Sequence, residues 1–159
     1  MATITQKQST SNNLGATPDG NLTAFHYVLE TNATGAAINS NSTAAIASGD
    51  VVRLGVLPAG FKLIDSQVVV KTAMSASVTG NLGFAYTDGE DVTGDAAQDA
   101  DYFGAALVLS SAARLRNVTT NHAVTLPKDA YLTLTTGGAA NAKASRIEVT
   151  VLGIMEGVA

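Results

Sequence analysis

Two histidines are the residues of this sequence whose type could support acid–base catalysis. Histidine is the side chain that titrates near neutral pH, so His26 and His122 would be the proton carriers of a hydrolase. Such an enzyme would also place its serine nucleophile in a recognisable turn, yet the pattern Gly-x-Ser-x-Gly is absent and Ser110-Ser111 lies in a featureless alanine-rich run. We therefore expect two histidines on strand surfaces and no catalytic residue.

A run of acids is the only candidate for metal binding. Asp88–Asp101 holds six of the thirteen acidic residues, and carboxylates on a loop are the hard ligands that Ca²⁺ prefers. Their spacing does not match an EF-hand loop, and a solvated loop that keeps the protein soluble explains them equally. Cysteine is absent, which excludes disulfides and thiolate metal sites, and no glycine-rich phosphate motif occurs. The sequence predicts neither a metal site nor a cofactor.

Composition narrows the class of partner. The formal net charge is −4 and only 14% of residues are charged, which argues against nucleic acid because binding to phosphates needs a basic surface. No apolar run is long enough to span a membrane, and the first residues do not resemble a signal peptide. Abundant Ala, Thr and Gly with few charges is typical of a β-rich protein. We expect synthesis in a cytoplasm and no contact with membranes.

The chain divides into an arm and one domain. Residues 1–22 are rich in Ser, Thr, Asn and Gln without periodicity, which fits either a disordered tail or an extended arm that orders on a partner. Residues 23–159 form the domain. Within it, residues 31–49 contain no charged or aromatic side chain, and this stretch reads as a long polar loop. Loops of that length inside a compact domain are usually functional or mobile.

Alternation of apolar residues predicts the strands of this domain. The expected strands are Thr23–Glu30, Asp50–Leu57, Lys62–Lys71, Ser77–Thr87, Tyr131–Thr136 and Arg146–Met155, with short ones at Val118 and at His122–Leu126. Tyr102–Arg116 fits a helical turn or a short strand. About eight short strands separated by turn signals predict an all-β protein: an antiparallel β-sandwich, jelly-roll-like, with an extended N-terminal arm.

Two strands carry predictions about single faces. In Lys62–Lys71 we expect Ile64, Val68 and Val70 to share one face. In Ser77–Thr87 the face opposite the large apolar residues is small and flat, so something could pack closely there. Its members are Thr79, Asn81, Gly83 and Ala85.

The order of these motifs resembles a known family. A strand leads to Leu57-Pro58-Ala59-Gly60, then to a Val/Ile strand, the segment Thr72–Ser77 and a strand containing Gly83-Phe84. The turn and strand at Pro127–Thr135 and the last strand at Ile147–Val151 continue the pattern. Over residues 50–155 this succession resembles the capsid decoration, or cement, proteins of tailed bacteriophages.

The resemblance implies a function without an active site. It implies a virion protein made in the host bacterial cytoplasm, which binds the major capsid protein on the outer surface of the head and stabilises the shell. Such sites lie on local symmetry axes, so we expect a homo-oligomer, first a trimer and second a dimer. The arm would contact the capsid and the flat face would contact another subunit; the residues concerned are Thr3, Ile4, Thr5, Leu14, Thr79, Asn81 and Gly83.

Two alternatives stay open at this point. The chain could be another virion component, such as a head-fibre base, a tail protein or a glycan-binding adhesin module, which would bind polysaccharide or cells. It could also be a small hydrolase, which would bring His26 or His122 beside an acid in a pocket.

Overall fold

The computed structural model describes residues 1–6 and 22–156, and this part of the chain contains strands and no helix. It therefore holds no helix that could cross a membrane. The strands are β1 (Thr3–Thr5), β2 (Leu22–Thr31), β3 (Val51–Leu57), β4 (Phe61–Thr72), β5 (Thr79–Tyr86), β6 (Asp99–Val108), β7 (Ala113–Arg116), β8 (Ala130–Gly137) and β9 (Ser145–Met155).

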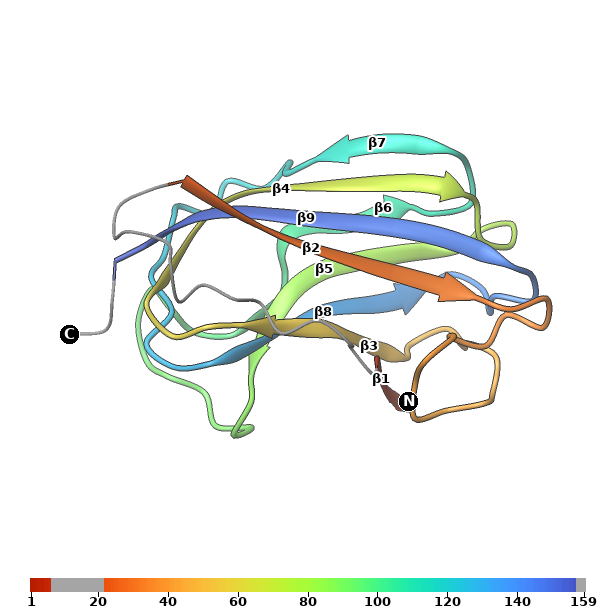
Figure 1. Ribbon diagram of the computed structural model, residues 1–159, viewed down its shortest axis with the longest axis horizontal. Coiled ribbons are helices and arrows are strands. Elements are labelled where there is room, and N and C mark those ends of the chain that lie inside the picture. Colours follow the sequence, from red (N-terminus) through yellow and green to blue (C-terminus); the bar gives the residue numbers. More distant parts are fainter. Residues whose placement is uncertain (7–21, 157–159) are drawn as a thin grey trace.

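The strands form two sheets that face each other (Figure 1). One sheet has the order β2-β9-β4-β7 and the other has the order β1-β3-β8-β5-β6. From β2 to β9 the chain pairs from the outside in: β2 with β9, β3 with β8, β4 with β7 and β5 with β6, all antiparallel. This succession is that of a long hairpin rolled into a sandwich, which is the jelly roll. The predicted fold class is confirmed.

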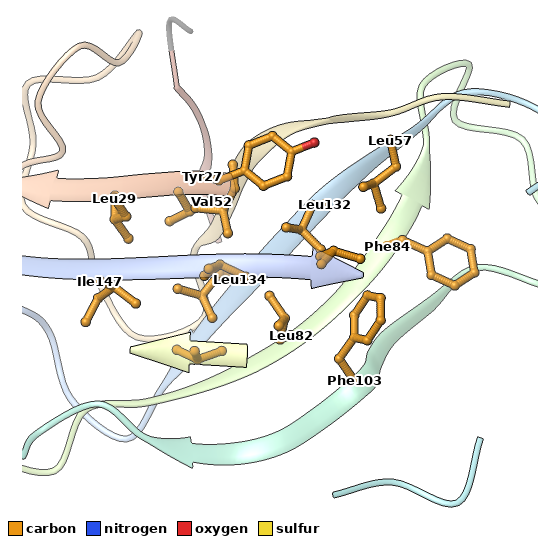
Figure 2. Packing of buried hydrophobic residues seen from close by; sticks show 14 of the residues in the cluster. Tyr27, Leu29, Val52, Leu57, Leu82, Phe84, Phe103, Leu132, Leu134 and Ile147 are labelled. Carbon is orange, nitrogen blue, oxygen red and sulfur yellow. The ribbon is translucent and has the colours of Figure 1, made fainter. Parts of the chain in front are cut away.

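The core lies between the two sheets and follows the alternation of the strands. Phe25, Tyr27 and Leu29 of β2 stand opposite Val151, Val149 and Ile147 of β9, and all six are at most 2% exposed. The facing sheet contributes the equally buried residues Leu82, Phe84, Leu132 and Leu134, as Figure 2 shows. Burial of this many large side chains is the main source of stability in a protein with so few charges.

The segment Tyr102–Arg116 resolves into strands. β6 and β7 occupy it, joined at residues 109–112, and β6 begins three residues before Tyr102, at Asp99. The strand expected at His122–Leu126 is wrong. That stretch makes only one isolated bridge, between Thr125 and Lys62.

Ile64 does not lie on the face predicted for it. The pairing of β4 with β9 shifts register between Leu63 and Asp65, and Ile64 is 42% exposed. A β-bulge turns one side chain away from its expected face, so Leu63 takes the buried place. Val68 and Val70 lie in the core as predicted.

The polar loop at residues 31–49 is packed onto the sandwich. Ala36, Ala37 and Ile46 are buried in it, and the Asn141 amide donates to the Ile46 carbonyl at 2.8 Å. Gly35 has a φ of 85°, and a Cβ there would lie 2.1 Å from the Asn141 carbonyl oxygen. The loop therefore fits closely against the connection between β8 and β9.

This contact can be tested with two glycines that share a backbone conformation. Gly89 has a φ of 77°, and nothing lies within 4 Å of an added Cβ. Gly89→Ala should therefore lower the free energy of unfolding by only about 1 kcal/mol, because a residue with a Cβ disfavours the left-handed region. Gly35→Ala adds a backbone clash, and we expect it to lower the free energy of unfolding by about 2 kcal/mol more, as overpacking does. Urea denaturation measures both. Equal losses would show that the loop does not pack as described.

Candidate functional site

One of the two histidines lies beside an acid, at the edge of an open hollow. His26 lies on the outer face of β2, where its Nδ1 is 3.0 Å from the Thr150 hydroxyl. His122 lies 3.6 Å from an Asp95 carboxylate oxygen, but these side chains are 68% and 86% exposed. They border an open hollow of about 520 Å³. Ser110 follows the far end of β6, and no serine is among the described residues that line the hollow.

The carboxylates of the acidic run have partners within the run and on the neighbouring connection at residues 117–129. Lys128 lies 2.7 Å from Asp88, and this hydrogen bond lowers the pKa of Asp88 below its ordinary value. Asp91 accepts from the Gln98 amide at 2.7 Å. The hydrogen bond that Asp101 shares with Asp99 raises the pKa of Asp101. Among the described residues no three His, Cys, Asp or Glu side chains gather as a metal site would require, so the structure gives the calcium hypothesis no support.

The start of the chain is built into the sandwich as an extra strand. β1 pairs with β3 in parallel, with Thr3, Ile4 and Thr5 beside Val51, Val52 and Arg53. It is therefore an exception to the predicted antiparallel pairing. Ile4 is 1% exposed and belongs to the hydrophobic core, whereas the side of β1 that carries Thr3 is open to solvent.

Two polar side chains hold β1 in place. Asp50 is 5% exposed and accepts the Ala2 amide at 2.7 Å and the Ala47 amide at 2.9 Å. Asn41 makes two hydrogen bonds with Thr5. Its side-chain oxygen accepts the backbone amide of Thr5 at 2.8 Å, and its backbone amide donates to the Thr5 carbonyl at 3.1 Å. β1 thus lies between β3 and the loop at residues 40–41. We call this site, formed by residues 36–53, the β1 socket.

The residues of this socket were not predicted as a site from the sequence. Asp50 is the only charged residue between Glu30 and Arg53, so it follows the uncharged stretch at once. The sequence did hold one signal for this site, the isolated acid at the end of the uncharged run. The side chain of an isolated Asp beside a loop often accepts hydrogen bonds from nearby backbone amides. The predicted contacts Thr3, Ile4 and Thr5 all lie on β1, while Leu14 lies outside the described residues.

The flat face of β5 is occupied in part by the chain itself. A Cβ on Gly83 would lie 2.0 Å from the Asp99 carbonyl oxygen, so the backbone of β6 fills the space above this glycine. The side-chain oxygen of Asn81 accepts the backbone amide of Ala106 at 2.8 Å. Ala106 has a positive φ of 50°. Thr79 is half-buried at the start of β5. Close packing at Gly83 is therefore intramolecular, and a contact of Thr79 or Asn81 with another subunit stays a prediction.

The topology separates charge between the two ends of the sandwich. The connections at residues 32–50, 73–78, 109–112 and 138–144 share one end, which we call the neutral end. Their only charged residues are Asp50, which is buried, and Lys143. The connections at 58–60, 87–98 and 117–129 form the opposite, acidic end. Residues 87–98 carry four acids and no basic residue.

The neutral end suits a surface that becomes buried in a complex. Its exposed side chains are mainly Ala, Ser, Thr and Asn, which lose little hydration energy when covered and leave no unpaired charge. Small side chains also lose little conformational entropy on burial. Thr3 and Thr79 stand at the borders of this end, next to the starts of β3 and β5.

Comparisons with known proteins find likeness in fold. No protein-family model matches the sequence, and a search of curated proteins finds no relative. Among solved structures, a chain of the capsid of Ralstonia phage GP4 is similar, with a TM-score of 0.66 and 14% identity over 97% of this chain and 98% of that one. A chain of the cyanophage Pam1 capsid asymmetric unit is similar with a TM-score of 0.57 and 13% identity over 86% of each chain. The chain shares its fold with these two chains.

The burial of Ile4 gives a direct test of the β1 socket. Ile4→Ala should lower the free energy of unfolding by about 2–4 kcal/mol, because it leaves a cavity in the core. Thr3→Ala, one residue earlier on the exposed side, is the matched control and should change it by less than about 0.5 kcal/mol. Chemical denaturation measures both. If the two variants were equally stable, residues 1–6 would not belong to the fold.

Proposed function

We propose that this protein is a decoration protein of a tailed-phage capsid. It binds the major capsid protein on the outer surface of the head and stabilises the shell. The observation that carries the proposal is the likeness in fold to the chain of the GP4 capsid structure. That likeness extends over nearly all of both chains, so the two are of nearly equal length. The chain resembles the whole of a small chain in a virion rather than one domain of a large protein.

The charge distribution supports an orientation for this binding. In the proposed complex the neutral end and the outer side of β1 face the capsid, and the acidic end faces solvent. Many weak contacts repeated with the symmetry of the shell give strong binding through avidity, without any single strong site. We propose a homotrimer first and a dimer second, because such sites lie on the symmetry axes of a shell. The host bacterial cytoplasm is the proposed place of synthesis.

The copy number of this chain in purified particles tests the function. We expect quantitative mass spectrometry to find it at a number comparable to that of the major capsid protein. A handful of copies per particle would contradict a coat on the head and indicate a tail or vertex component. Complete absence from the particles would overturn the virion assignment, including the glycan-binding virion alternative, and would favour the hydrolase alternative.

The orientation is tested by adding charge at either end of the sandwich. Ala76 and Ser111 are exposed at the neutral end, and Thr93 is exposed at the acidic end. Ala76→Glu and Ser111→Glu should each weaken binding to particles at least about tenfold, because an unpaired carboxylate would be buried. Thr93→Glu should bind like the unmodified protein. Sedimentation with particles that lack the protein measures this; a loss only in Thr93→Glu would reverse the orientation.

A further inference from the structure

β1 is an addition to a fold that is complete without it. The eight strands from β2 to β9 form the rolled hairpin, and β1 stands outside that series as the only parallel strand of the described residues. Every hydrogen bond described above for residues 2–6 reaches the loop at residues 40–41 or the start of β3. The strand is therefore bound as a peptide would be bound, by backbone pairing together with one buried anchor, Ile4.

The socket holds β1 through its backbone and through the Ile4 side chain. It binds both sides of the strand, since the Gln6 amide donates to the Arg53 carbonyl at 3.2 Å while Asn41 bonds Thr5 from the other side. Its buried Asp50 accepts the amide of Ala2. Without β1, a buried carboxylate would lose a donor and the core would open at Ile4, which makes an empty socket costly. An occupied socket is therefore favoured over an empty one, and in this structure its occupant is residues 2–6.

The segment between β1 and β2 is long enough for β1 to reach the socket of a neighbouring copy. Fifteen residues separate Gln6 from Leu22, and at about 3.3–3.6 Å per residue they could reach about 50 Å. Gln6 lies beside Arg53, four residues before the end of β3, and Leu22 begins β2 near that same end in the facing sheet. With a rise of about 3.3 Å per residue and sheets about 10 Å apart, the span needed is only about 20 Å.

We propose that β1 is exchanged between copies of this chain, so that residues 2–6 of one copy fill the β1 socket of the next. Exchange keeps every contact of the strand and costs no new surface, which is why it is an economical route to oligomers. It also makes each copy hold its neighbour, because separation requires Ile4 to leave a hydrophobic core. The proposal goes beyond the proposed function, since it needs a second copy of the chain and no capsid.

Engineered cysteines show which copy fills the socket. Thr3 and Val51 are register partners on the outer side of the pair, and the chain has no cysteine of its own. Neighbouring strands lie about 4.8 Å apart, which is within the Cα separation that a disulfide spans. Thr3→Cys and Val51→Cys chains carrying different tags are co-expressed, purified and oxidised. We expect a reducible heterodimer that contains one chain of each kind and takes up about half of the chains if copies mix at random.

Two controls establish what the absence of the mixed heterodimer would mean. The double variant Thr3→Cys/Val51→Cys shows whether the disulfide forms in the folded protein at all. If it closes only within one chain and the mixed single variants give no heterodimer, β1 stays in its own copy and the proposal is wrong. Thr3→Cys mixed with Val118→Cys, an exposed site at the acidic end, should give no heterodimer. An equal yield there would show random collision and would also overturn the proposal.

Discussion

The pairing of β2 with β9 is the constraint on which the rest of the molecule depends. It brings the first and last strands of the roll together over ten residue pairs, from Leu22–Ile154 to Thr31–Ser145. Once this pair is set, each inner pair follows, and successive connections alternate between the two ends of the sandwich. Neutral loops and acidic loops, interleaved along the sequence, are thereby sorted to opposite ends. The surface that we assign to binding is thus a consequence of topology.

Stability in this protein rests on burial rather than on charge. The ion pairs of Lys62 with Glu156 and of Lys128 with Asp88 lie at the surface, where such pairs contribute little. The core, in contrast, takes up seven of the eight aromatic side chains. The eighth, Tyr131, lies under the Arg53 guanidinium, whose carbon is 4.5 Å from the ring centre. A protein built this way can leave the connections of one end with a single exposed charge, Lys143, and still fold.

The β1 socket links this fold to assembly. Asp50 and Asn41 are polar groups that each bond to residues 2–5, far from them in sequence. Their position between β3 and the packed loop makes the first strand part of the core while it stays outside the roll. In the exchange that we propose, the same peptide would complete the fold and join neighbouring copies.

Sequence alone determined the strands whose two faces differ in polarity. β2 and β9 alternate in the way that a half-buried strand must, and they were predicted as strands because a period of two leaves no second choice. Tertiary structure alone decided the rest. Ile64 is exposed because a bulge in β4 moves it off the core face, and Thr3–Thr5 forms a strand because β3 and Asn41 supply its partners. Bulges and added strands depend on groups distant in sequence, so no local pattern contains them.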